Sequence, residues 1–239
     1  SMQQLTTPDG LTLSFVGPPI EEGPLPALFY FALSAKDSLK TDPFNQPVKL
    51  LSKSPIRIFS LSLPGHENNL PPENALTLWK EQMEKKIDPI TPFILQVKKG
   101  IDYLLKQNSV SKLSIAGLSR GAFVACHVAA LCPEIPSILG FAPLTQLKFG
   151  KDFLLDLEYL IPKLYNRTIR FYIGNCDQRV GTENAFAFIQ KLALKAKENK
   201  IRASPIELFI TPSIGYQGHG TSPLIFANGV DWLKKQLQL

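Results

Sequence analysis

The sequence contains few cysteines and no long apolar run, and these absences exclude several classes of protein. Its three cysteines are odd in number and lack the spacing of metal ligands: Cys126, Cys132 and Cys176. They predict neither a disulfide framework nor a zinc site, so we expect reduced thiols, no metal and no cofactor, with Cys176 as a buried packing residue. No stretch approaches the roughly 18 apolar residues of a membrane span, and no signal peptide is evident. The sequence predicts a cytoplasmic protein without a membrane span.

Dense runs of one charge are also missing. The chain has a formal net charge of +6 and a pI near 9.2, yet its lysines are spread over helix-like stretches such as residues 191–200. A basic run interleaved with aromatic residues, typical of nucleic-acid binding, does not occur. We therefore expect a solvated, lysine-bearing surface and no nucleic-acid partner. With 44% hydrophobic and 19% charged residues, the composition excludes disorder and supplies a sizeable core.

The sequence does contain a regular alternation of short β-prone runs with longer stretches of helical period. This alternation is typical of βα units, and it predicts an α/β fold with a mostly parallel central sheet and helices on both faces. The expected strands are residues 11–15, 27–33, 56–63, 112–116, 137–141, 168–173 and 206–211. The expected helices are residues 72–86, 92–107, 120–131, 151–164, 182–199 and 223–236. Thr182 is the expected N-terminal cap of the clearest helix.

No repeat or low-complexity linker divides the chain, so we expect one α/β domain over residues 1–239. Two connections are longer than their neighbouring elements require, at residues 64–92 and 144–167. Extra segments that follow strands often lie over a site as a lid. These segments therefore predict a small helical lid or insertion, and in the alternative interpretation they cover the sheet edges.

A G-x-S-x-G pattern at residues 117–121 provides a candidate nucleophile, Ser119. In a chain of this composition the pattern occurs by chance about 0.06 times, so its context decides its meaning. It lies between a strand-like run, KLSIA, and a helix-like run, RGAFVACHVAALC. A nucleophile elbow at such a junction strains the serine and needs small residues two positions before and after it, which Gly117 and Gly121 provide.

A serine hydroxyl needs a general base near neutral pH, and the sequence has three histidines. His127 lies two helical turns beyond Ser119, too far along the predicted helix to reach the hydroxyl, and we expect it in the core. His66 lies in a loop early in the chain and is the weaker candidate. His219 lies in a glycine-rich loop after the last predicted strand, where it is free to approach the serine. We therefore expect His219 to be the base.

The base in turn needs a carboxylate that orients its ring. Asp177 lies just beyond the carboxyl end of the predicted strand 168–173, at the edge of the sheet where α/β sites assemble. The order Ser119, Asp177, His219 is the α/β-hydrolase order and differs from the orders of chymotrypsin and subtilisin. The alternative carboxylates lie in the helix-like segment 151–164, where we expect them on a solvated face: Asp152, Asp156 and Glu158.

These motifs resemble those of α/β hydrolases along nearly the whole chain. They are most similar to single-domain serine hydrolases of the dienelactone-hydrolase and prolyl-oligopeptidase type, in which an S-R-G or S-x-G-G elbow recurs. FSLSLPGHE around His66 resembles the D-L-P-G-H-G loop of that family, IGNCDQRVG around Asp177 resembles its acid motif, and GHG at His219 resembles its catalytic histidine loop. The resemblance implies an α/β-hydrolase fold and an esterase that needs no cofactor.

The resemblance also implies two backbone N–H groups that stabilise an oxyanion. Arg120, which follows the nucleophile, supplies one of them. The other comes from FYFALSAKDS, where Ala32 and Leu33 replace the usual His-Gly pair of the family; Leu33, Ser34 and Ala35 are the candidates, and we expect Ser34. The guanidinium of Arg120 either binds an anionic substrate group or pairs with a nearby carboxylate that braces the turn.

Together these residues predict a serine hydrolase that cleaves a carboxylic ester, or a related small acyl substrate, through an acyl-enzyme. An acyltransferase would use the same three residues, with an alcohol or a thiol in place of water. A non-catalytic binding protein with a hydrolase fold is a further alternative, and the presence of all three candidate residues disfavours it. Both a monomer and a homodimer are compatible with the sequence.

Overall fold

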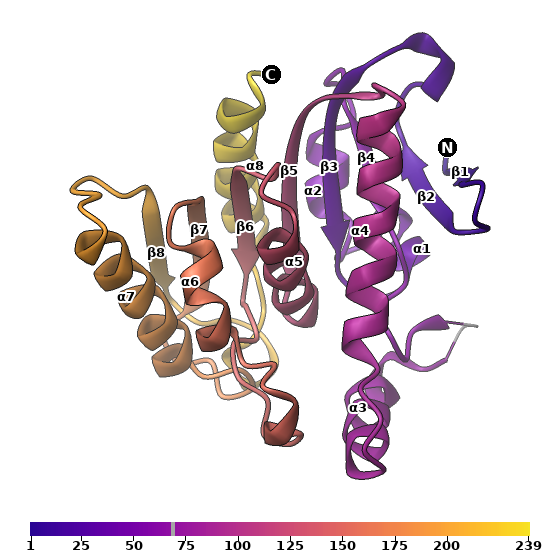
Figure 1. Ribbon diagram of the computed structural model, residues 1–239. Coiled ribbons are helices and arrows are strands. Elements are labelled where there is room, and N and C mark those ends of the chain that lie inside the picture. The colour runs from indigo at the N-terminus through magenta and orange to yellow at the C-terminus, as the bar shows by residue number, and fades with distance from the viewer. Residues whose placement is uncertain (68–69) are drawn as a thin grey trace.

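An eight-stranded, mostly parallel sheet forms the centre of the computed structural model, which describes residues 1–67 and 70–239 (Figure 1). The strands are β1 (Gln3–Thr6), β2 (Thr12–Val16), β3 (Leu25–Phe31), β4 (Arg57–Ser60), β5 (Val110–Leu118), β6 (Ser137–Phe141), β7 (Thr168–Gly174) and β8 (Ile206–Thr211). Their order across the sheet is β1-β2-β4-β3-β5-β6-β7-β8. β1 and β2, and β2 and β4, pair antiparallel, and all the other neighbouring pairs are parallel.

Helices cover both faces of this sheet, because alternate residues of its central strands point to opposite sides. In β3, Phe29 and Phe31 belong to one buried cluster, whereas Leu28 and Tyr30 belong to the other. The first face carries α3 (Ala75–Glu84), α4 (Ile90–Lys106), α5 (Arg120–Leu131), α6 (Ile161–Leu164) and α7 (Thr182–Glu198). The second face carries α1 (Ala35–Lys40), α2 (Gln46–Leu50) and α8 (Pro223–Leu237) (Figure 1). The predicted α/β architecture, with helices on both faces, is confirmed.

The expected elements agree best in the second half of the sheet. β6, β8 and α5 have the predicted bounds, and β7 is one residue longer than expected. β1, α1 and α2 were not predicted: each is six residues or shorter. β1 has no fully buried residue, and helices of five or six residues span less than two turns, too few for a helical period to stand out in a sequence.

Two local predictions were wrong. The single helix expected at residues 151–164 is instead two 3-10 turns, Lys151–Phe153 and Leu157–Leu160, followed by the four-residue α6. The break occurs at Leu154, whose positive φ of 55° cannot continue a right-handed helix. Thr182 does not cap α7, because Gly181 occupies the cap position and the hydroxyl of Thr182 bonds elsewhere.

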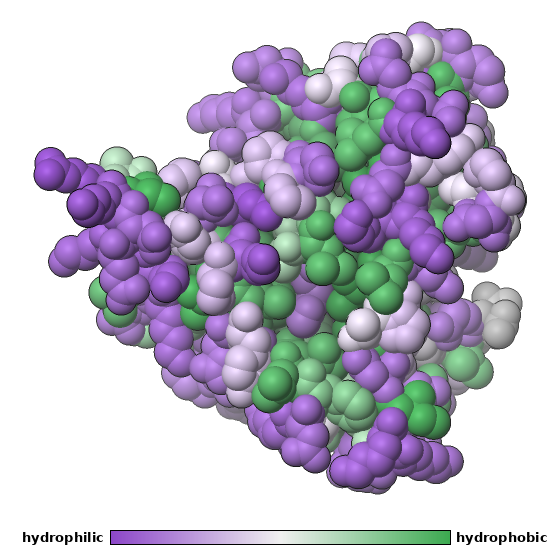
Figure 2. Space-filling model, in the orientation of Figure 1, coloured by the Kyte–Doolittle hydropathy of each residue, from purple (hydrophilic) through white to green (hydrophobic). Residues whose placement is uncertain are grey.

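The carboxyl ends of β3, β5, β6, β7 and β8 all lie at one edge of the sheet, the lower edge in Figure 1. The same orientation in Figure 2 shows hydrophilic residues over most of the surface, with apolar residues gathered in its middle and lower parts. None of the helices within residues 1–67 and 70–239 has the length and apolarity that crossing a membrane requires. The loops at the lower edge contain all the residues that the sequence motifs single out as reactive.

Candidate active site

Ser119 lies on a tight turn between β5 and α5, with φ and ψ angles of 57° and −114°. Two glycines allow strand and helix to approach this closely. A Cβ atom on Gly117 would lie 2.2 Å from the backbone of Gly121, and one on Gly121 would lie 1.9 Å from the carbonyl oxygen of Phe31. The N–H of Ser119 donates to the carbonyl oxygen of Phe141 at 2.8 Å, which ties the turn to β6. The surrounding contacts thus hold the serine in a strained conformation.

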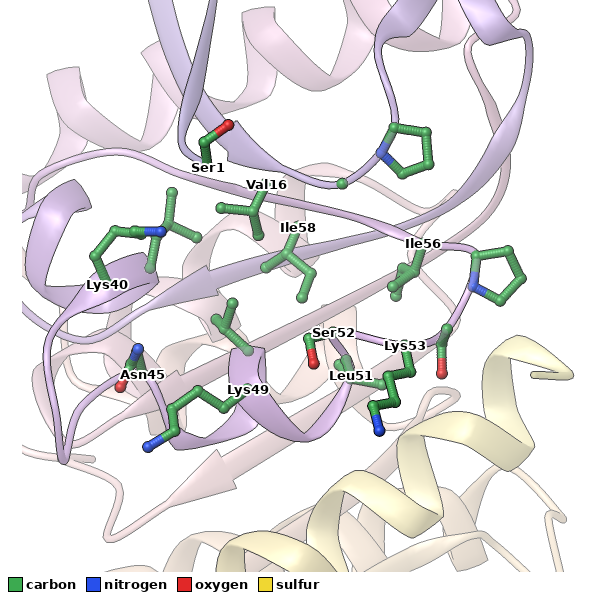
Figure 3. A pocket seen from close by; sticks show the side chains of 16 residues that line it. Ser1, Val16, Lys40, Asn45, Lys49, Leu51, Ser52, Lys53, Ile56 and Ile58 are labelled. Carbon is green, nitrogen blue, oxygen red and sulfur yellow. The ribbon is translucent and has the colours of Figure 1, made fainter.

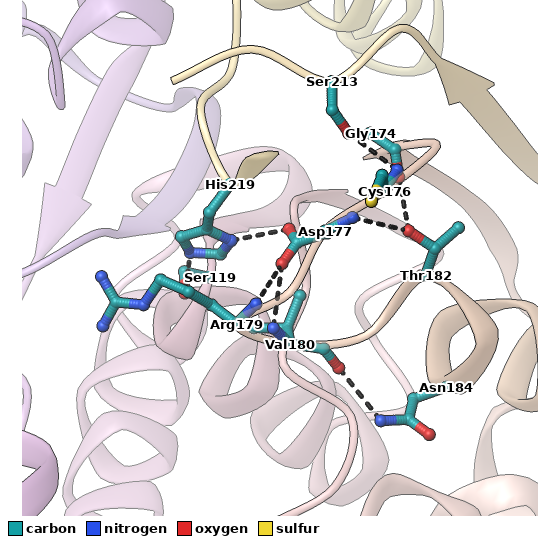
Figure 4. Close-up of polar contacts among 10 residues, drawn as sticks. All are labelled: Ser119, Gly174, Cys176, Asp177, Arg179, Val180, Thr182, Asn184, Ser213 and His219. Atoms are coloured by element: carbon teal, nitrogen blue, oxygen red, sulfur yellow. Dashed lines mark hydrogen bonds and ion pairs between the residues drawn. The ribbon is translucent and has the colours of Figure 1, made fainter. Parts of the chain in front are cut away.

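His219 lies between Ser119 and Asp177 and bonds to both (Figure 4). Its Nε2 is 2.9 Å from the Oγ of Ser119, and its Nδ1 is 2.7 Å from the Oδ2 of Asp177. The three residues follow β5, β7 and β8, whose parallel arrangement brings their loops to the same edge of the sheet. Ser119 and Asp177, which lie 100 and 42 positions before His219 in the sequence, therefore join it in one chain of hydrogen bonds.

The carboxylate of Asp177 is buried and receives three hydrogen bonds. Its Oδ1 accepts the backbone N–H groups of Arg179 and Val180, both at 2.9 Å, while its Oδ2 faces His219. Burial alone would raise the pKa of this carboxyl, but the bonds from His219 and the two N–H groups outweigh it and lower the pKa below its ordinary value. An ionised Asp177 fixes the proton of the imidazole on Nδ1, which leaves Nε2 free to accept the proton of Ser119.

Two further residues position the Asp177 and His219 loops, and neither role was predicted from the sequence. The Oγ1 of Thr182 donates to the carbonyl oxygen of Gly174 at 2.6 Å and accepts the N–H of Asp177 at 3.0 Å. Gly218 has a φ of +70°, and a Cβ there would lie 2.1 Å from the carbonyl oxygen of Cys176. The glycine next to His219 was a visible signal for this close approach, whereas nothing in the local sequence indicated the role of Thr182.

The other histidines lie outside this chain of hydrogen bonds. His127 is buried in α5, as expected, with its Nε2 2.7 Å from the carbonyl oxygen of Leu155. His66 is also buried, and burial together with the nearby charge of Arg120 lowers its pKa to about 4. Its imidazole is therefore neutral at physiological pH.

The alternative carboxylates also have other partners. Asp152 and Glu158 form ion pairs at the surface, with Lys86 and Lys191 respectively. Asp156 is buried, contrary to the expectation of a solvated face, because its carboxylate accepts the N–H of Leu147 and pairs with a lysine. The structure places none of the three against His219 and brings only Asp177 there.

Ser119 lines a cavity of about 220 Å³. Its lining is mostly apolar, with two arginines: Ala32, Leu33, Pro43, Phe44, Leu118, Ser119, Arg120, Arg179, His219, Gly220, Thr221 and Phe226. A second cavity, of about 650 Å³, also has Arg179 in its lining. Both long connections contribute to it, with Leu76 from residues 64–92 and Phe149 from residues 144–167. Positions 68–69 of the first connection lie outside the described residues.

A third cavity, of about 620 Å³, lies between β2, β4 and α2 (Figure 3). Val16, Leu51 and Ile58 form part of its apolar floor, and lysines stand at its rim. It shares no lining residue with the cavity at Ser119. We therefore do not assign it to the candidate active site.

Some of the backbone N–H groups near Ser119 already donate a hydrogen bond within the protein, and others do not. The N–H of Ala35 donates to Ser62 at 2.9 Å, and the N–H of Leu33 donates to Ser38 at 3.3 Å. Among the described residues, no acceptor bonds the N–H of Ser34 or of Arg120. These two groups are thus free to donate to a substrate, although Leu33, and not Ser34, lines the cavity.

The structure bears on the two alternatives for the side chain of Arg120. No carboxylate of the described chain lies within ion-pairing distance of Arg120, so the alternative of a carboxylate brace has no support in this part of the molecule. Its guanidinium instead lies over the indole ring of Trp79, 5.6 Å from the ring centroid. Cys176, next to Asp177, is exposed and not the buried packing residue that we expected. No cluster of candidate metal ligands occurs within residues 1–67 and 70–239.

The sequence matches no protein-family model and no curated protein. Solved structures, in contrast, resemble this one over nearly its whole length. TT1662 from Thermus thermophilus has a TM-score of 0.72 at 16% identity, over 100% of this chain and 98% of its own. The Pyrococcus furiosus esterase Pf2001 has a TM-score of 0.66 at 14% identity, over 100% and 91% of the two chains. A cold-adapted esterase from an Arctic intertidal metagenomic library has a TM-score of 0.69 at 20% identity, over 98% and 92%.

An eight-stranded, mostly parallel sheet that superposes on these proteins defines the class: the chain has the α/β-hydrolase fold, as its motifs predicted. At identities of 20% or less, the likeness establishes the fold alone. Within that fold its structural neighbours include esterases.

Proposed function

We propose that this protein is a serine hydrolase that cleaves carboxylic esters. The observation that carries the proposal is the continuous hydrogen-bonded chain from Ser119 Oγ through His219 to Asp177. It supplies a nucleophile, a base and a group that orients the base, which are the three parts that acyl transfer to a serine needs. The esterases among the structural neighbours support the same reaction class.

In the proposed reaction, the Oγ of Ser119 attacks the ester carbonyl carbon while its proton passes to Nε2 of His219. The tetrahedral intermediate then collapses: the bond to the alkoxy oxygen breaks, and the alcohol leaves with the proton from His219. Water attacks the resulting acyl-enzyme as His219 takes one of its protons. Release of the carboxylic acid returns that proton to Ser119, and the enzyme is regenerated.

We further propose that the N–H groups of Arg120 and Ser34 bind the oxyanion of the tetrahedral intermediates. Their lack of an acceptor among the described residues supports this assignment, because a donor already bonded within the protein would have to be released first. A single domain over residues 1–239 accounts for the site, with residues 64–92 and 144–167 bordering the larger cavity.

Labelling with a fluorophosphonate probe tests the proposal. The wild-type protein should be labelled, and Ser119→Ala should not, while Ser111→Ala, at an exposed position of β5, should be labelled like the wild type. Equal labelling of wild type and Ser119→Ala would refute a nucleophilic role for Ser119. Product analysis of a nitrophenyl ester, with and without an added alcohol, then separates hydrolysis from acyl transfer to the alcohol.

A further inference from the structure

The guanidinium of Arg120 is a partly buried cation, and no carboxylate of the described residues forms an ion pair with it. Its Nη1 is buried and donates no hydrogen bond to an acceptor within the described residues. Burial, and secondly the charge of Arg179, lower the pKa of Arg120 to about 10, so the group is still charged at neutral pH. The contact with Trp79 positions the guanidinium plane but leaves the Nη1 hydrogens unbonded. A buried charge with free donors is costly unless an anion is present to receive them.

Arg179 adds a second cation to the same cavity. Both arginines line the 220 Å³ space that contains Ser119 and His219. Figure 4 shows the side chain of Arg179 extending from the Asp177 turn toward Ser119. Arg179 forms no ion pair with any carboxylate of the described chain. Its backbone supports Asp177 while its side chain is free, so the two functions of this residue are separable.

Asp177, the carboxylate of the site, is already bonded to His219 and to two backbone N–H groups, and no acidic residue is among those that line the cavity at Ser119. His66, whose pKa responds to Arg120, is neutral near pH 7. The neighbouring 650 Å³ cavity, which Arg179 also lines, contains Lys80 and Lys148 and a single acidic residue among its lining, Glu183. Positions 68–69, which lie outside the described residues, are asparagines and carry no charge. The net local charge therefore favours an anion in the catalytic cavity.

We propose that the natural substrates of this protein are esters that carry an oxyacid anion, a carboxylate or a phosphate, close to the scissile bond. This inference rests on the proposed serine hydrolase function. The planar guanidinium groups of Arg120 and Arg179 bind the anion, because each presents paired N–H donors that match two oxygens of a carboxylate or phosphate. The ester carbonyl is thereby held beside the Oγ of Ser119.

Matched substrates test this preference. Three acetate esters share the acyl group and differ in the alcohol: 3-acetoxypropanoate, 2-acetoxyethyl phosphate and the neutral 3-methylbutyl acetate. Monoethyl succinate and the neutral ethyl 4-methylpentanoate place the difference in the acyl group. We expect kcat/KM to be at least about tenfold higher for an anionic ester than for its neutral counterpart. Equal or faster turnover of both neutral esters would overturn the proposal. A difference in kcat/KM within the acetate esters would place the anion in the alcohol part of the substrate, and a difference between monoethyl succinate and ethyl 4-methylpentanoate would place it in the acyl part.

Variants then assign the preference to the arginines. Arg179→Gln should lower the ratio of anionic to neutral kcat/KM by about tenfold, and Arg179→Lys should restore part of it, because the charge remains while the paired donors are lost. Arg120→Met should lower the ratio as well. Arg202→Gln, at an exposed position remote in sequence from the site, serves as the control and should leave the ratio unchanged. An unchanged ratio in Arg179→Gln and Arg120→Met would refute the arginine site.

A binding measurement separates failure of this inference from failure of the proposed function. In Ser119→Ala, calorimetric titration with monoethyl succinate and with 2-acetoxyethyl phosphate reports affinity without turnover. We expect one of the two to bind more than about tenfold tighter than its neutral counterpart, and Arg179→Gln on the same background to abolish the difference. Binding without hydrolysis in the wild type would contradict only the proposed function. Hydrolysis of neutral esters without anion binding would contradict only the arginine site.

Discussion

The α-carbon of Gly121 faces the carbonyl oxygen of Phe31 so closely that a Cβ atom on the glycine would lie 1.9 Å from that oxygen. Gly121→Ala therefore forces α5 away from β3 and shifts Ser119. We expect a loss of about 2–3 kcal/mol in the free energy of unfolding, measured by urea denaturation, and loss of fluorophosphonate labelling.

Gly100→Ala in α4 is the matched control for this substitution. Its Cβ would meet the movable end of the Leu13 side chain at 3.0 Å, and an alanine is favoured within a helix. We expect its stability to stay within about 1 kcal/mol of the wild type. Normal labelling of Gly121→Ala would show that the turn tolerates a side chain, contrary to the geometry.

Asp177→Asn should remove most of the activity without unfolding the protein. An amide at this position favours the tautomer of His219 whose Nε2 carries the proton, and that nitrogen is then unable to accept the proton of Ser119. We expect kcat for a nitrophenyl ester to fall by about 10⁴. Asp231→Asn, at an exposed position of α8, should have wild-type kcat. A decrease of tenfold or less in Asp177→Asn would mean that another group orients His219.

Thr182→Val should weaken the support of the Asp177 turn. The variant loses the bond to the carbonyl of Gly174 and leaves the N–H of Asp177 without its acceptor. We expect the free energy of unfolding to fall by about 1–2 kcal/mol and kcat to fall with little change in KM. Thr182→Ser retains the hydroxyl and should recover kcat. If serine does not recover it, the methyl group and not the hydroxyl is the important part of Thr182.

His66 should make the protein less stable in acid. Burial, together with the charge of Arg120, lowers its folded pKa to about 4 from an ordinary value of 6.5. Between these two values the unfolded chain binds a proton that the folded protein does not, so stability falls as the pH decreases from 6.5 toward 4. His66→Gln cannot titrate, and we expect its free energy of unfolding to fall by about 2 kcal/mol less over this window. Identical pH profiles, from denaturation at several pH values, would show that the histidine titrates normally.

The sequence predicted the central strands better than the periphery, for a physical reason. β6 is buried along its whole length and β7 over its last four residues, so both contain an apolar run that stands out in the sequence. β1, at the edge of the sheet, reads QQLT and has only two half-buried residues, which gives no comparable signal. The segment 151–164 has an apolar content that suits a helix, yet the buried carboxylate of Asp156 draws it into irregular turns.

In the candidate site, the features that depend on neighbouring residues could be predicted from the sequence, and those that depend on distant segments could not. The elbow, the GHG loop and the Asp177 turn were visible because each needs glycine or a fixed order of residues within a few positions. The sequence did not indicate which side chains surround Arg120. Whether a cation has a carboxylate beside it depends on which distant loops fold over it, and Trp79, 41 positions earlier, is the residue that covers the guanidinium.

The order in which the strands join the sheet has a consequence during protein synthesis. From β5 onward each new strand adds beside the previous one, so the sheet grows outward in the order in which the ribosome makes it. The turn with Ser119 can form against β3 and β6 while His219 is still inside the ribosome. If Ser119 and His219 have the roles proposed above, a growing chain carries a serine without its base, and we expect the serine to become reactive only when the loop after β8 has docked.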